Sequence, residues 1–214
     1  MKKYGHLREK ALEWRKDGMA IGEICERLSL GKSTVYYWIK DIPIERTEKQ
    51  TEAQKAGTKG MQRKYAAIRE AAYSEAAKDA SKRLDDPSFR DFVMLYLTEG
   101  YRRTRNCVSV ANSNLCLMRL AVKWMRVLSE KEIHYAIQYH VDQDLDELKA
   151  YWAEGLGIDA GGIRFQRKSN SGKMDKRKWR SEYGVLTVRV GDTVLRSKIQ
   201  AWMDKLQDEI NRVW

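Results

Sequence analysis

The chain is poor in proline, cysteine, histidine and long apolar runs, and these shortages exclude several classes of protein. No apolar run approaches the roughly 20 residues that a membrane-spanning helix needs, so no membrane partner is expected. The first ten residues, MKKYGHLREK, lack the apolar stretch of a secretion signal. Three cysteines without CxxC spacing and only three histidines argue against a zinc site. An odd number of cysteines without an export signal fits a reducing cytoplasm.

Acidic residues are also in short supply. The sequence has 41 Lys and Arg against 30 Asp and Glu, which gives a formal net charge of +11. Such an excess favours a polyanionic partner, most simply nucleic acid, and hence a cytoplasmic, nucleoid-associated location. The alternative is a protein whose basic balance serves no binding. With 214 residues, 43% of them hydrophobic, the chain can form one full domain and a smaller one.

The two prolines, Pro43 and Pro87, divide the chain where its pattern changes. We therefore expect an N-terminal domain over 1–44, a helical linker over 45–86 and a C-terminal domain over 87–214. The linker consists mostly of Ala, Lys, Glu, Arg and Gln, which favour helix. It is expected to be helical from about 61 to 84, with glycines at 57 and 60 interrupting or beginning the helix. A solvated linker is the alternative.

The first domain has the apolar spacing of three short helices. In the stretch IGEICERLSLGKSTVYYWI (21–39), apolar residues at helical spacing predict one helix over 21–28 and another from Lys32, joined by a tight turn at 29–31. The stretch resembles the resolvase-like and Cro-like helix-turn-helix families, although Ser29 stands where that turn usually carries glycine. The resemblance implies that the last helix enters the major groove of DNA. Its predicted DNA-contacting residues are Lys32, Ser33, Thr34, Tyr36, Tyr37 and Lys40. A helical hairpin that binds protein is the alternative.

The remainder predicts an α+β domain. Asp86 and Pro87 form a strong helix start, and the helix is expected to run to Gly100. Strands are predicted at 108–110, 135–139, 163–165 and 185–190, and helices at 114–128, at 145–155 and after Asp192. The helix over 114–128 is expected to bury Leu117, Leu120, Ala121, Trp124 and Leu128.

A strongly basic segment lies between the last two predicted strands. Residues 164–180 carry eight Lys and Arg residues against one acid, Asp175. Flanked by strands, the segment predicts a hairpin that lies on a phosphate backbone, and a solvated surface loop is the alternative. Three arginines that follow the helix ending at Gly100 are expected to join this surface. The predicted DNA-binding residues of this domain are Arg102, Arg103, Arg105, Arg164, Arg167, Lys168, Lys173, Lys176, Arg177, Lys178 and Arg180.

One apolar stretch, FVMLYLTEG (92–100), ends in an acid and a glycine and is followed by VSVANSN and a helix. This order resembles the LAGLIDADG homing-endonuclease fold over about 87–207. The resemblance implies that the sheet lies in the major groove and that Glu99, before Gly100, binds a divalent metal. It also implies a homodimer through the helix 92–100, or a monomer without the usual two-helix site. Met94 stands where the family has a small residue. A helix-turn-helix beside such a domain also resembles noncatalytic sporulation-type regulators of Gram-positive bacteria, in a different order.

Two functions follow from these patterns. The first is a sequence-specific double-stranded DNA-binding protein, a transcriptional regulator of bacterial or phage type that needs no cofactor. The alternative is a Mg²⁺-dependent, homing-type DNA endonuclease that acts as a homodimer, with Glu99 as its catalytic and metal-binding residue. The second hypothesis would also explain the carboxylate of Glu99, which costs free energy at the end of a packed apolar helix unless a partner or metal compensates it.

Overall fold

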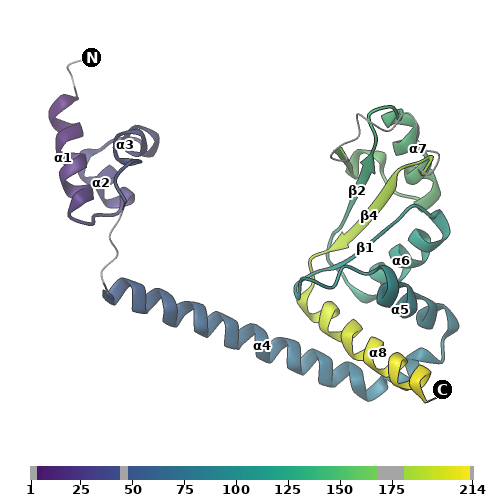
Figure 1. Cartoon of the computed structure of the whole chain (residues 1–214). Helices are drawn as coiled ribbons and strands as arrows, with labels where there is room; N and C mark the ends of the chain where they lie inside the picture. Colours follow the sequence, from purple (N-terminus) through teal and green to yellow (C-terminus); the bar gives the residue numbers. More distant parts are fainter. Residues whose placement is uncertain (1–3, 44–47, 168–180, 213–214) are drawn as a thin grey trace. The chain divides into compact units, whose positions relative to one another are not determined.

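The computed structural model describes residues 4–43, 48–167 and 181–212, and these have the predicted α+β architecture (Figure 1). Short helices are followed by a long helix and then by a mixed four-stranded sheet with helices. The chain divides into two compact units, Met1–Arg63 and Lys64–Trp214, and the division falls inside the long helix. The elements are α1 (Gly5–Lys16), α2 (Ile21–Leu28), α3 (Lys32–Ile39), α4 (Glu48–Leu84), α5 (Pro87–Glu99), β1 (Val108–Asn112), α6 (Leu115–Leu128), β2 (Ile133–Tyr139), α7 (Leu145–Leu156), the short 3₁₀ helix η1 (Ala160–Gly162), β3 (Ile163–Arg167), β4 (Val185–Val190) and α8 (Thr193–Asn211).

The N-terminal unit has a small apolar core of its own. Ala11 of α1, Ile24 of α2 and both Val35 and Ile39 of α3 are almost completely buried in it. Helix α2 has the predicted bounds and α3 begins at the predicted residue. The short helices expected in this part of the chain are therefore confirmed, and each contributes its apolar stripe to one shared core.

Helix α4 is longer than predicted. It begins at Glu48 rather than near Met61, and both Gly57 and Gly60 lie inside it without interrupting it. A glycine in a helix costs about 1 kcal/mol relative to alanine. The Ala, Lys, Glu and Gln residues around the two glycines are good helix formers, and they offset that cost over 37 residues.

Only the C-terminal part of α4 belongs to a core. Ala72, Ala76, Ala80 and Leu84 are buried, and the last three join the core of the C-terminal unit. Large apolar side chains earlier in α4 differ, since Met61 and Tyr65 are exposed. The end of α4 is thus an integral part of the C-terminal unit.

Helix α5 begins as predicted and lies at the centre of the C-terminal unit. The carboxylate of Asp86 caps it by accepting the backbone N–H groups of Ser88 at 2.8 Å and Phe89 at 3.2 Å. Phe89 packs edge-on against Trp124 of α6 and Trp202 of α8, with ring centres 4.9 and 5.0 Å apart. Helix α5 therefore packs against both α6 and α8 through large aromatic side chains.

The sheet has the strand order β1-β4-β2-β3. Strand β4 is antiparallel to both β1 and β2, whereas β2 and β3 are parallel. A parallel pair needs a crossover connection, and α7 lies in the one between β2 and β3. Leu186, Val188 and Val190 point to the buried face, against which α6 packs over β1 and β4 (Figure 1).

The hairpin predicted for the basic segment is wrong, because β3 and β4 lie on opposite sides of β2 and do not pair. Every second residue of β4, namely Leu186, Val188 and Val190, is fully buried, which suits a central strand. Strand β3 exposes Arg164, Gln166 and Arg167, and such polar residues suit the edge of a sheet. The segment between them consequently connects an edge strand to a central one.

Candidate nucleic-acid interface

The outer face of α3 carries all six residues predicted to contact DNA. Each of them is exposed, and Tyr37 is exposed to 69%. Their exposure follows from the helical period, because Val35 and Ile39 face the core and leave the opposite face to solvent. The rings of Tyr36 and Tyr37 meet edge-on with centres 5.9 Å apart. The face thus presents hydroxyl, ammonium and aromatic groups together. Its members are Lys32, Ser33, Thr34, Tyr36, Tyr37 and Lys40.

A tight turn sets the position of α3 relative to α2. Ser29 has φ 55° and ψ 41°, and within the described residues no other non-glycine residue has a positive φ. The turn closes with the N–H of Ser29 on the carbonyl of Glu26 at 3.2 Å and that of Leu30 on Cys25 at 3.1 Å. A left-handed residue at this place ends α2 and lets the chain reverse into α3. The turn therefore needs a left-handed residue, a conformation that glycine adopts most easily, and here Ser29 adopts it.

One face of the sheet in the C-terminal unit is polar and partly open to solvent. The register places Arg189 of β4 between Ser109 of β1 and His134 of β2. Arg164 of β3 lies on the same face, and it is exposed, as are Arg189 and His134. None of the four strands contains Asp or Glu. The sequence analysis did not select Arg189, although the alternation along β4 could have indicated its outward direction.

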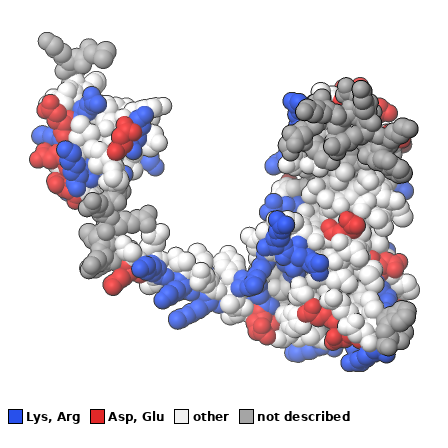
Figure 2. Space-filling view, in the orientation of Figure 1, with Lys and Arg blue, Asp and Glu red and all other residues white. Residues whose placement is uncertain are grey.

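A second basic feature of this unit is a cavity of about 540 Å³ lined by four arginines. Arg102 and Arg105 follow α5, Arg69 comes from α4 and Arg196 from α8. Figure 2 shows Lys and Arg side chains gathered on the C-terminal unit, beside the part of α4 that belongs to this unit. Glu70 is the one acid in the lining. Arg102 and Arg105 were predicted, whereas Arg69 and Arg196 were missed because they lie far from them in the sequence.

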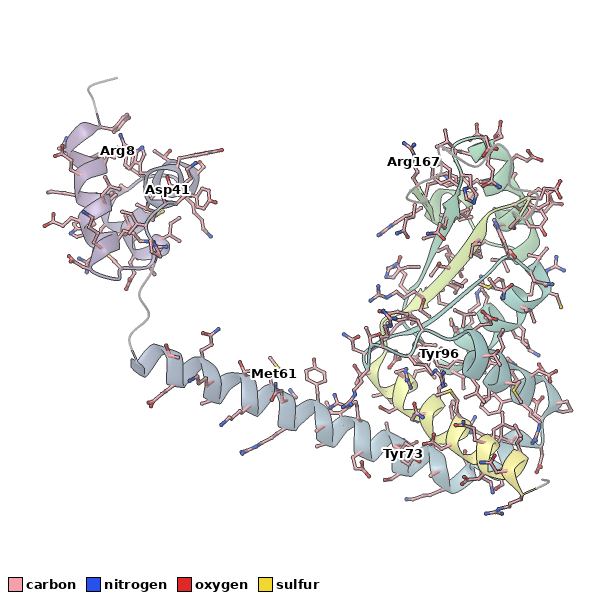
Figure 3. All side chains as sticks on the ribbon, viewed as in Figure 1. Arg8, Asp41, Met61, Tyr73, Tyr96 and Arg167 are labelled. Atoms are coloured by element: carbon pink, nitrogen blue, oxygen red, sulfur yellow. The ribbon has the colours of Figure 1, made fainter. Side chains whose placement is uncertain are left out.

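Tyrosines next to the cavity are held in their neutral form. The Tyr73 hydroxyl donates to the Asp204 carboxylate at 2.9 Å, and this bond raises the pKa of Tyr73 above its ordinary value. Burial raises the pKa of Tyr96, and the guanidinium of Arg196, 5.7 Å from its ring centre, opposes that shift. Figure 3 labels both tyrosines, one on α4 and one on α5. The cationic character of the cavity thus comes from its arginines without competing phenolate charge.

The structure locates only part of the predicted basic segment. Arg103 is exposed after α5, and Arg164 and Arg167 are exposed on β3, where Figure 3 labels Arg167. Arg103, Arg164 and Arg167 do not line the cavity of about 540 Å³. The other predicted members lie outside the described residues: Lys168, Lys173, Lys176, Arg177, Lys178 and Arg180.

Glu99 does not bear the desolvation cost expected from the sequence. It is the last residue of α5 and its side chain is exposed, so water solvates the carboxylate. Among the residues that the structure describes, no three Asp, Glu, His or Cys side chains gather where they could hold a metal ion. A Mg²⁺ site would need further ligands, and one chain does not bring them to Glu99 within its described residues.

Gly100 has a structural reason of its own. A Cβ added there would collide with the Tyr96 carbonyl and approach its ring carbons to 2.8 Å. The acid and glycine at the end of α5 are thus explained by solvent exposure and by close packing on Tyr96, which is fully buried.

Comparison with known proteins gives no match to a family model, to a curated protein or to a solved structure. In the described part of the chain, no helix combines the length and apolar character needed to cross a membrane.

Proposed function

We propose that this chain is a sequence-specific double-stranded DNA-binding protein, a transcriptional regulator of bacterial or phage type with a nucleoid-associated location. The observation that carries the proposal is the outer face of α3, where six polar, basic and aromatic residues lie exposed over a small, separately buried core. The order α2, turn, α3 supports a helix-turn-helix, whose second helix reads base edges in the major groove.

The C-terminal unit supports the same proposal. Its sheet presents Arg164, Arg189 and His134 on a face whose strands contain no acid, which suits contact with phosphates. We propose that this unit is LAGLIDADG-like and adds a second DNA contact. Two modules on one chain raise affinity by linkage, since binding of the first raises the local concentration of the second.

The proposal is tested by selecting duplexes from a random library with the full chain and measuring affinity for a selected site over a salt series. Lys32→Ala should weaken binding and reduce the slope of log K against log salt by about 0.9, the value for one lost phosphate contact. Lys10→Ala is a matched control, because it removes the same charge from an exposed position on α1. Its slope should equal that of the unmodified chain.

Equal slopes for the two lysine variants would refute the assignment of α3 to the groove. Failure of the full chain to enrich any duplex would refute sequence-specific DNA binding altogether.

The endonuclease alternative depends on Glu99. We place it second because, among the described residues, no group of three Asp, Glu, His or Cys side chains is placed to hold a metal ion. Incubating the selected duplex with the chain and Mg²⁺ or Mn²⁺ separates the two functions. Cleavage by the unmodified chain that is lost in Glu99→Gln would establish the nuclease. It would also imply that a second copy of the chain or another source supplies the remaining metal ligands.

A further inference from the structure

Arg196 is a buried cation whose charge is not compensated by a carboxylate within the described residues. It is 7% exposed, and its Nε is buried without a hydrogen-bond partner. Its Nη1 donates to the side-chain oxygen of Gln200 at 3.1 Å, and its guanidinium lies over the ring of Tyr96. A buried guanidinium with only neutral partners is energetically unfavourable unless an anion joins it.

The groups around Arg196 do not neutralise its charge. None of the four cavity arginines forms an ion pair in the described part of the chain, although six other basic residues do. The nearby carboxylate of Asp204 accepts from Tyr73 at 2.9 Å and from Gln200 at 2.7 Å, so neutral donors occupy it. The cavity wall therefore holds four guanidinium groups against the single carboxylate of Glu70.

We propose that this cavity is a binding site for a phosphate-bearing ligand. Guanidinium groups bind phosphate oxygens through paired, charge-assisted hydrogen bonds, and Arg196 brings to the cavity wall a guanidinium that forms no ion pair within the described residues. Ser197 and Gln200 add neutral hydrogen-bonding groups to the same wall. A phosphate would also neutralise the buried charge that α8 carries.

The size of the cavity indicates more than an inorganic ion. Its volume of about 540 Å³ lies within the range of roughly 300–1,000 Å³ that is typical of small-molecule sites. Two sources share the required chemistry, namely a free phosphorylated small molecule and a stretch of nucleic-acid backbone. The assignment does not depend on DNA binding, because a free phosphate compound tests the cavity alone.

The test uses the full chain and sodium pyrophosphate, with binding measured by isothermal titration calorimetry at low salt. Arg69→Gln and Arg105→Gln change cavity residues that are only partly buried or exposed, so both variants should fold. Each should weaken pyrophosphate binding about tenfold or more, the equivalent of one charge-assisted hydrogen bond. Arg126→Gln is the matched control: the same change at an exposed arginine of α6, outside the cavity lining, should alter the dissociation constant by less than about twofold.

A second arm identifies the source of the phosphate. Salt slopes are measured for the same variants on a selected duplex. A slope reduced by about 0.9 in Arg69→Gln, but not in Arg126→Gln, assigns the cavity to the nucleic-acid backbone. Lost pyrophosphate binding with an unchanged DNA slope assigns it to a free ligand.

The proposal is overturned if the cavity variants bind pyrophosphate as tightly as Arg126→Gln does. It is also overturned if the unmodified chain binds no pyrophosphate and the cavity variants leave the DNA slope unchanged. A chain that binds pyrophosphate in the cavity but no DNA would refute the proposed function and leave this site standing.

Discussion

Replacing Asp192 should destabilise the C-terminal unit through two lost hydrogen bonds. The residue precedes α8, and its buried carboxylate accepts the N–H of Leu195 at 3.0 Å and the hydroxyl of Ser129 at 2.8 Å. Lys131 places its ammonium 3.7 Å away. One side chain therefore fixes the start of α8 and ties it to the end of α6.

The size of the effect follows from these contacts. Loss of a helix cap costs about 1 kcal/mol, and a partly buried hydroxyl left without its acceptor costs about 1–3 kcal/mol. Asp192→Ala should therefore lose about 2–4 kcal/mol, which corresponds to a fall of roughly 4–16 °C in Tm for a unit of this size. Asp192→Asn keeps an oxygen for the cap and should lose less.

The charge of Asp192 also predicts a dependence on pH. Burial alone would raise the pKa of this carboxyl, but the hydrogen bonds from Leu195 and Ser129 and the charge of Lys131 hold it below its ordinary value of 3.8. A lowered folded-state pKa contributes stability above that ordinary value, and the contribution is lost as pH falls through the folded-state pKa. The difference in Tm between the unmodified chain and Asp192→Asn should thus be full at neutral pH and shrink below pH 3.8.

Thermal unfolding of the full chain, followed by circular dichroism, measures these differences. Hydrogen exchange of the α8 amides assigns them to the C-terminal unit. Asp85→Ala, at an exposed acid, is the surface control. A fall in Tm for Asp192→Ala no larger than for the control, or a difference from Asp192→Asn that persists at low pH, would refute the reasoning.

Two further predictions concern backbone geometry. Ser29→Gly should stabilise the N-terminal unit by roughly 0.5–1 kcal/mol. Glycine removes the strain of a left-handed residue at φ 55°, and this gain exceeds the cost of the extra freedom that glycine gives the unfolded chain. Slower hydrogen exchange in α2 and α3 would support the prediction, and faster exchange would contradict it. Gly100→Ala should destabilise the C-terminal unit by about 1–3 kcal/mol through overpacking against Tyr96. Gly162→Ala, where an added Cβ meets nothing within 4 Å, is its control, and equal Tm values would contradict the assigned contact.

Features set by neighbouring residues were predictable from the sequence. Asp86 before Pro87 forms the expected cap, and the bounds of α2 and β4 agree with their apolar spacing. Each of these signals depends on side chains within a few positions, so one sequence contains all of the information. The same holds for the exposed face of α3, whose direction follows once Val35 and Ile39 are assigned to the core.

The buried face of α6 could not be predicted, and the prediction was partly wrong. Met118, Val122 and Met125 are buried together with the predicted Ala121, while the other predicted residues, such as Trp124, are only partly buried. Apolar residues occur on almost every side of this helix, so their spacing does not select one face. The surfaces of α5, α7 and the sheet select it instead.

Long-range arrangement was equally inaccessible. Nothing in the sequence of β3 or β4 states that β2 lies between them, since strand order depends on the path of the connections. The arginine cavity has the same origin, because Arg69 and Arg196 are 127 positions apart and meet only through the packing of α4 and α8. Charge could be predicted for this chain from composition, but its concentration at one cavity could not.

Under the proposed function, α5 contributes by positioning a basic loop rather than by presenting Glu99. The buried Tyr96 donates its hydroxyl hydrogen to the carbonyl of Tyr101 at 3.2 Å, and the N–H of Tyr101 donates to the carbonyl of Ser109 in β1 at 2.8 Å. These two hydrogen bonds fix the backbone of Tyr101, which directly precedes Arg102. Because Gly100 lets the chain pass close to the Tyr96 ring, the loop leaves α5 directly toward the sheet edge. The apolar run thus supplies the rigid support that a charged loop needs if its arginines are to meet phosphates at a defined place.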